Sequence, residues 1–234
     1  MKIGARILLI FKSQFSHVTL YAPSRIHRRA IRRGLLLMNK RLLSQMLHQR
    51  VSGLRSSLGY FFRGDFEYVL RGVAFDYVPR GLYIEDFRFP LFDPFGPNLT
   101  YSDRLLERGG FIGNGEMSEE AIVDFVMSSP EVRNAFVQDK PAELPDFVHY
   151  IELKPPRSLE NPGVRFVYAA ALILLGQELR AANLLDELAP SLDREKDIAN
   201  YNLLRTSLRQ GFETARAVLE QVRQKNLQML GVIL

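Results

Sequence analysis

Acidic side chains recur along a stretch of the chain whose composition is typical of β-strands. The acids of this stretch are Asp65, Glu67, Asp76, Glu85, Asp86 and Asp93. Two carboxylates that face each other on a sheet can act as general acid and base or bind Mg²⁺. Asp76 and Glu85 are the candidate catalytic pair, because a hairpin between them would make them cross-strand neighbours. Polar side chains on the solvated face of an antiparallel sheet explain the same pattern without catalysis, and we favour that explanation.

Other side chains with the chemistry of an active site are scarce. The chain has no cysteine, which excludes disulfides, cysteine nucleophiles and cysteine-ligated zinc. The four histidines, His17, His27, His48 and His149, are too scattered to give a ligand pair at helical or strand spacing. The glycine-rich segment 109–116 lacks the lysine and the glycine spacing of a phosphate-binding loop, and no Gly-x-Ser-x-Gly motif occurs. We therefore expect no metal site and no cofactor.

A second candidate site is the basic N-terminal end of the chain. Residues 1–64 hold 13 lysines and arginines and no acid, whereas residues 65–234 hold 18 basic residues and all 26 acids. Five arginines recur at helical spacing, so a helix would place them on one broad face: Arg25, Arg28, Arg29, Arg32 and Arg33. Such a face can neutralise the phosphates of a nucleic acid or of an anionic membrane.

A different interpretation of residues 1–37 involves no site at all. An organised amphipathic pattern begins only at Met38, and the residues before it contribute eight basic side chains and no acid. We favour the interpretation that residues 1–37 are a disordered basic extension or an over-extended start. An arginine-rich start without acids also resembles a mitochondrial transit peptide, which is a minor alternative. Mass analysis of the N-terminus of the native protein distinguishes these interpretations.

Hydrophobic periodicity predicts the elements that position the acids. Between residues 38 and 58, apolar side chains recur at steps of three and four, which predicts an amphipathic helix. Residues 66–78 and 82–92 are rich in aromatic and β-branched side chains and flank the turn Pro79-Arg80-Gly81, which predicts an antiparallel hairpin. Ser118, followed by two glutamates, has the pattern of a helix N-cap.

The C-terminal third of the sequence is predicted to be helical. Residues 147–153, between prolines, are predicted as a short strand, and a domain boundary is placed near residue 156. Beyond it, two segments each have the pattern of two helices, with turns at Gly176 and Gly211. The predicted fold class is α+β, with an N-terminal helix packed on a small antiparallel sheet and a helical-hairpin region after it. The predicted divisions are residues 1–37, 38–155 and 156–234.

The first predicted helical hairpin resembles a tetratricopeptide repeat. The matching positions are the small residues Ala169 and Ala181, the turn residue Gly176, the apolar contacts Leu185 and Leu188, and Pro190 near the end. The turn glycines Gly176 and Gly211 lie 35 residues apart, close to the period of roughly 34 residues in this family. The resemblance implies a helical unit that presents a surface to another protein.

Residues 59–94, from "GYFFRGDFEYVLRG" to "FRFPLFDP", with "LTYSDRL" after them, resemble a family of bacterial α+β proteins of unknown function. The resemblance covers roughly residues 38–125 and rests on overall pattern. It implies a bacterial, cytoplasmic protein, and it brings no catalytic residue or cofactor to this chain.

These observations lead to one expected function and two alternatives. We expect a non-enzymatic bacterial protein that binds another protein, one version of which is an immunity or antitoxin-like protein with an acidic surface that covers a basic toxin. The first alternative is an enzyme that uses Asp76 and Glu85. The second is nucleic-acid or anionic-membrane binding through residues 1–37. The sequence leaves the partner and the oligomeric state open.

Overall fold

The described part of the chain combines a six-stranded sheet with helices, which confirms the predicted α+β class. The computed structural model describes residues 38–64, 66–96, 98–105, 110–136 and 142–232. The described residues from 38 onward belong to one compact unit. The five arginines predicted to contact phosphate therefore lie outside the described residues.

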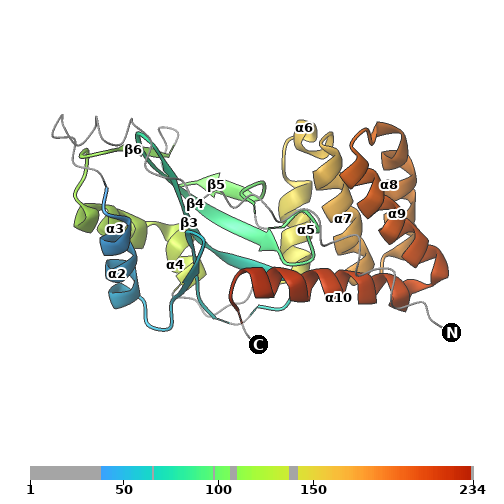
Figure 1. The fold of residues 1–234 in the computed structure, drawn as a ribbon, viewed down its shortest axis with the longest axis horizontal. Helices are drawn as coiled ribbons and strands as arrows, with labels where there is room; N and C mark the ends of the chain where they lie inside the picture. Colours follow the sequence, from blue (N-terminus) through green and yellow to red (C-terminus); the bar gives the residue numbers. More distant parts are fainter. Residues whose placement is uncertain (1–37, 65, 97, 106–109, 137–141, 233–234) are drawn as a thin grey trace. The chain divides into compact units, whose positions relative to one another are not determined.

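The centre of the sheet is a long hairpin of β3 (Val69–Val78) and β4 (Gly81–Pro90), as predicted (Figure 1). Pro79 and Arg80 form its two-residue loop, because Val78 pairs directly with Gly81. The shorter strands are β1 (Arg55–Ser57), β2 (Tyr60–Phe62), β5 (Ser102–Arg104) and β6 (Phe111–Gly113). β1 and β2 extend the sheet beyond β3, while β5 and β6 pair with different parts of β4.

Gly72 in β3 allows the neighbouring strand β2 to approach closely. A Cβ atom at this position would lie 2.0 Å from the carbonyl oxygen of Phe61. Backbone atoms cannot give way as a flexible side chain can, so only glycine fits here.

One face of the sheet packs against α2 (Lys40–Arg50), α3 (Glu119–Ser128) and α4 (Pro130–Phe136). The buried side chains of this face are Phe61, Val73, Phe75, Leu82 and Ile84 from the strands, and Leu43, Leu47, Ile122, Val126 and Val132 from the helices. These strand residues alternate along β3 and β4, as a sheet with one face on this core requires.

The helix boundaries on this face follow local signals. The Ser118 hydroxyl accepts a hydrogen bond from the Ala121 amide at 3.2 Å, which confirms the predicted start of α3. The helix predicted over residues 38–58 is too long, because α2 ends at Arg50 and residues 55–57 form β1. Gly53, with a φ of 71°, turns the chain between them.

The rest of the chain is helical, and one part of it was predicted wrongly. The helices are α5 (Leu144–Glu152), α6 (Pro156–Leu159), α7 (Pro162–Leu174), α8 (Glu178–Leu188), α9 (Glu195–Gln210) and α10 (Phe212–Met229), with a 3₁₀ turn at Ala189–Ser191. The strand predicted at residues 147–153 lies mostly in α5. The buried side chains of α5 recur at steps of three, one and three, which is a helical period. They are Leu144, Phe147, Val148 and Ile151.

The helices pair as α7 with α8 and α9 with α10, with the chain turning at the two glycines singled out in the sequence. Gly176 and Gly211 have φ angles of 74° and 132°, which residues with a Cβ rarely adopt. α5 packs with α7, so contacts cross the boundary placed near residue 156.

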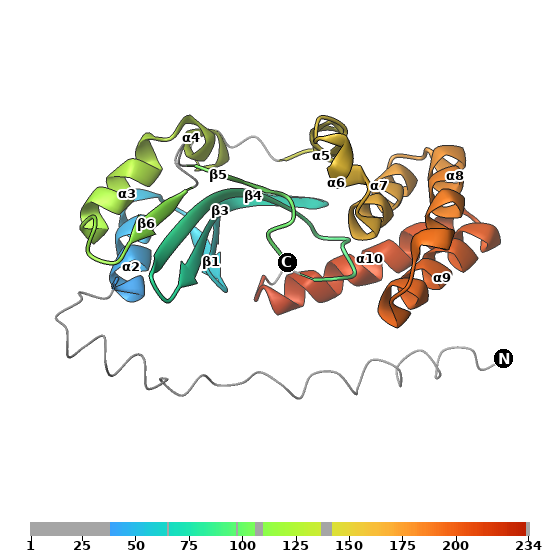
Figure 2. The same ribbon diagram turned by 90° about the horizontal axis from the view of Figure 1, so that it is seen from above.

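α10 connects the helices to the sheet (Figure 2). Its first part packs on α9 and α7, and Leu227 and Leu230 at its end pack on the second face of the sheet. The strand side chains on that face are Phe62, Leu70, Ala74, Phe87 and Phe89. The long hairpin is therefore covered on both faces by helices far from it in sequence.

Candidate functional site

Asp76 and Glu85 lie on the same face of the sheet, but they are not direct cross-strand neighbours. The register places Asp76 opposite Tyr83 and Glu85 opposite Ala74. The pairing predicted from the sequence is therefore wrong by two residues, because the loop at Pro79 and Arg80 sets the register. Asp76 is exposed, whereas Glu85 is buried.

Glu85 is engaged by the edge strand β5. The hydroxyl of Ser102 donates a hydrogen bond to Glu85, and the Nε atom of Arg104 lies 3.9 Å from the same carboxylate. Tyr60 lies opposite Ala74 on this face. Burial, and then the charges of Asp76 and Glu85, raise the pKa of Tyr60 to about 12. Glu85 thus holds an edge strand in place, and Tyr60 keeps its proton at neutral pH.

A buried ionic cluster lies on the opposite face, around Asp86. This carboxylate is 1% exposed, and its Oδ2 atom lies 3.0 Å from Nη2 of Arg88 and 3.4 Å from Nη2 of Arg71. Burial raises the pKa of Asp86, and the two arginines act against that shift. The sequence analysis named Asp86 only as one acid among six. The hairpin register pairs Arg71 directly with Arg88, and no sequence pattern indicated that register.

The ionic cluster continues from the sheet to the end of α5. Asp103 in β5 accepts from Arg88 at 3.3 Å and from the ammonium of Lys154 at 3.0 Å. Both cations also lie over the ring of Tyr150, at 4.3 and 4.5 Å from its centroid. Burial lowers the pKa of Lys154, but interactions with Tyr150 and Asp103 outweigh it and raise the pKa above its usual value. Lys154 is therefore a cation, and not a free amine nucleophile.

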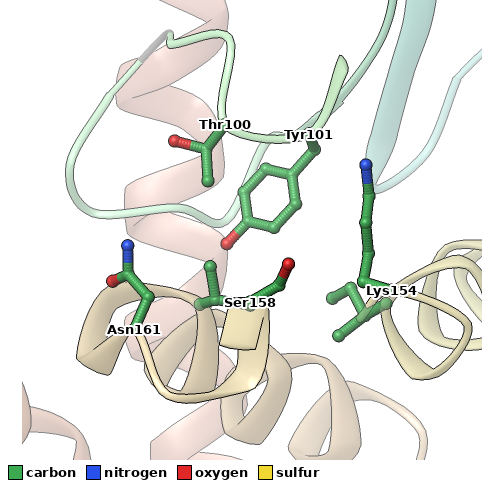
Figure 3. A pocket seen from close by; sticks show the side chains of 7 residues that line it. Thr100, Tyr101, Lys154, Ser158 and Asn161 are labelled. Carbon is green, nitrogen blue, oxygen red and sulfur yellow. The ribbon is translucent and has the colours of Figure 1, made fainter. Parts of the chain in front are cut away.

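A cavity of about 270 Å³ lies beside this cluster (Figure 3). Its walls come from the segment before β5 and from α5, α6 and α7. The residues that line it are Thr100, Tyr101, Ile151, Lys154, Ser158, Asn161 and Val164. Lys154 lines the cavity and also pairs with Asp103 of the ionic cluster, so the two features are adjacent. No sequence motif indicated this cavity, because its seven lining residues are spread over several segments between residues 100 and 164.

A third feature is an exposed surface where α5, α7 and α8 meet. The Tyr168 hydroxyl donates to Glu152 at 2.6 Å and accepts from Arg180 at 2.9 Å, and Arg180 also lies 3.5 Å from Glu152. Leu153 follows Glu152 in the chain and is 72% exposed, while Leu179 precedes Arg180 and is 83% exposed. We call these five residues the leucine surface. Sequence reasoning missed it, because Leu153 looked like the end of a short strand and Leu179 like part of an amphipathic helix.

Two kinds of site were looked for within the described ranges, a cluster of metal-ligating side chains and a membrane-spanning helix. Among the described residues, no group of three or more histidine, cysteine, aspartate or glutamate side chains is placed to hold a metal ion. None of the helices in that part of the chain has the length and apolar character needed to span a bilayer. His48 contacts Ser56 at 3.0 Å, and His149 lies on α5.

Comparison with protein-family models, with curated proteins and with solved structures finds no match for this chain. The resemblances drawn from the sequence therefore stay predictions. Any proposal about function has to rest on the geometry described above.

Proposed function

We propose that this chain is a non-enzymatic protein that binds another protein through the leucine surface. The observation that carries the proposal is the exposure of Leu153 and Leu179, each of which is next in the chain to a member of the Glu152–Arg180 ion pair that Tyr168 bridges. Covering a fully exposed leucine side chain contributes roughly 1.5–3 kcal/mol. Tyrosine and arginine are also the residue types that most often dominate binding energy at interfaces.

The ionisable groups of the described residues favour binding over catalysis. A general acid or base needs a pKa near the working pH and access to a substrate. Asp86 is buried between two guanidinium groups, and Lys154 is a paired ammonium. Burial raises the pKa of Asp93 to about 6, but its two oxygens accept from the Phe95 amide and the Asn98 side chain. Asp86 and Asp93 thus organise the structure around them, and Glu85, one of the two acids of the enzyme alternative, accepts a hydrogen bond from Ser102.

In this proposal the paired helices α7–α8 and α9–α10 are tetratricopeptide-like units, and the protein acts in the bacterial cytoplasm. The resemblance at Ala169, Gly176 and Ala181 supports that view. Residues 38–234 carry 23 basic and 26 acidic side chains, so this part of the chain has a small negative charge. That balance favours a basic partner, as in the immunity or antitoxin-like version.

The experiment captures a partner with the full chain as bait and then measures the affinity of the purified pair. Leu153→Asp and Leu179→Asp should each weaken binding by about tenfold or more, because they place a charge in the buried contact. Leu58→Asp is the matched control, since Leu58 is 73% exposed in the turn between β1 and β2. A stoichiometric partner whose affinity is unchanged by both surface variants contradicts the proposal, as does the absence of any stoichiometric partner.

A further inference from the structure

Part of the second face of the sheet stays in contact with solvent. The end of α10 packs on this face around Leu70 and Phe89. Nearer the loop between β3 and β4 the same face is open, because Asp76 is exposed and Phe111 is 37% exposed. The strand pairing places six side chains next to one another there, which we call the aromatic face: Tyr60, Asp76, Tyr83, Glu85, Arg104 and Phe111.

Asp76 lies between two tyrosines on the aromatic face. It is directly opposite Tyr83 in the register of β3 and β4, so their Cβ atoms are about 5 Å apart. Tyr60 lies opposite Ala74, two residues before Asp76, so Tyr60 is a diagonal neighbour of this carboxylate. Burial, and then the charges of Asp76 and Glu85, raise the pKa of Tyr60, so the charges that act on its ring are both negative.

The aromatic face already holds one arginine between an acid and a tyrosine. The guanidinium carbon of Arg104 lies 4.2 Å from the centroid of the Tyr83 ring, and its Nε atom lies 3.9 Å from the carboxylate of Glu85. A guanidinium group is planar, so its face can stack on a ring while its edge donates to a carboxylate. Arg104 shows that this combination of groups fits a guanidinium group on this face.

Asp76 and Tyr60 present the same two groups without a cation from the described part of the chain. Asp76 forms no ion pair and accepts no hydrogen bond from any residue that the structure describes. The ring of Tyr60 is held in place by its edge-on contact with Phe87, with 4.9 Å between centroids. Arg55, a cation further along this face, donates to the carbonyl oxygen of Gly64 and lies over the ring of Phe66 instead. An external cation is therefore the partner that the charge of Asp76 favours.

We propose that the aromatic face binds an arginine side chain of a partner protein. The guanidinium group donates to the carboxylate of Asp76 and stacks on the ring of Tyr60, in the way that Arg104 pairs with Glu85 over Tyr83. An apolar residue next to that arginine contacts the exposed ring of Phe111. The aromatic face shares no residue with the leucine surface, so each proposal can fail without the other.

The test is an NMR titration of the full chain with the capped peptide Leu-Arg-Leu, and with the same peptide carrying citrulline or lysine in place of arginine. The arginine peptide should bind saturably and shift the amide signals of Tyr60, Asp76 and Tyr83. Citrulline has the shape of arginine without its charge and should bind about tenfold more weakly, and lysine, which cannot stack, about threefold more weakly. The proposal is overturned if the arginine peptide binds no more tightly than the other two, does not saturate, or shifts only the leucine surface.

Variants assign the binding to Asp76 and Tyr60. Asp76→Asn removes the charge at an exposed position, and should weaken binding of the arginine peptide about fivefold and reduce its dependence on salt. Asp193→Asn, the matched control, makes the same change at an exposed acid before α9 and should leave binding unchanged.

Tyr60→Leu removes the ring and should weaken binding about threefold. Undiminished binding by a folded Tyr60→Leu variant contradicts the stacking. If that variant does not fold, the comparison of Asp76→Asn with Asp193→Asn decides, and equal affinities of these two variants overturn the proposal.

Discussion

Asn226, near the end of α10, donates hydrogen bonds from its side-chain nitrogen to the carbonyl oxygen of Leu91 at 2.6 Å, and to that of Asp93 at 2.8 Å. Leu91 directly follows β4, so the last helix is fastened to the end of the central hairpin by a residue 135 positions away in sequence. This buried contact joins the sheet to the helices that form the cavity and the leucine surface.

Asn226→Leu should destabilise the protein by about 2–3 kcal/mol, because two buried carbonyl groups lose their donor. The free energy of unfolding in urea measures the effect. Gln228→Leu, an exposed position two residues further along α10, is the control and should change stability by less than about 0.5 kcal/mol. Equal stabilities of the two variants would show that the contact does not hold α10 on the sheet.

Asp86→Asn should cost about 3 kcal/mol, since it leaves two partly buried arginines without their shared carboxylate. Asp103→Asn removes a carboxylate that is largely exposed, and should cost less than about 1 kcal/mol. Thermal unfolding of both variants at neutral pH gives the comparison. A larger loss for Asp103→Asn than for Asp86→Asn would contradict the central place of Asp86 in the ionic cluster.

The contribution of Asp93 to the free energy of unfolding should fall as the pH rises from about 4 to about 6. The folded protein holds the proton of this carboxyl up to a pKa of about 6, whereas the unfolded chain releases it near 3.8. Between these values the native state binds more protons than the unfolded state, so raising the pH favours unfolding, by up to about 3 kcal/mol. Unfolding in urea at several pH values should show this slope in the wild type and a weaker one in Asp93→Asn. An unchanged slope in the variant would mean that another group is responsible.

Gly72→Ala should destabilise the sheet by about 3 kcal/mol, because the added methyl group meets the Phe61 carbonyl oxygen at 2.0 Å. Gly113→Ala is the control, since its nearest neighbour is the movable side chain of Glu116 at 3.2 Å. Hydrogen exchange of the β2 and β3 amides reports where the structure loosens. If the β2 and β3 amides of Gly72→Ala exchange as slowly as those of the wild type, the added methyl group does not destabilise the strand pair, and the prediction is wrong.

Leu179→Ser should change the free energy of unfolding by less than about 0.5 kcal/mol, because that side chain contacts mostly water. Leu185→Ala, on the same helix but fully buried, should cost about 2–5 kcal/mol. Parallel urea titrations make the comparison. A large loss in Leu179→Ser would assign that leucine to folding and remove it from the proposed interface.

Local signals in the sequence predicted several elements correctly. The Ser118 cap, the glycine turns at 176 and 211 and the β3–β4 hairpin depend on residues within a few positions of one another. Predictions failed where a local pattern had two readings. Aromatic and β-branched residues made α5 look like a strand, although its apolar side chains also had helical spacing, and packing on α7 selected the helix.

The sequence by itself determined the α+β class, the absence of cysteine chemistry and the separation of a basic end from an acidic body. Tertiary structure alone decided which charges meet. A two-residue loop set the register that separates Asp76 from Glu85 and pairs Arg71 with Arg88. The packing of α5 and α7 beside β5 then brought Lys154 to Asp103, and Asn161 to the same cavity as Tyr101. These contacts join residues that are tens of positions apart, so they depend on register and packing, which composition and periodicity do not encode.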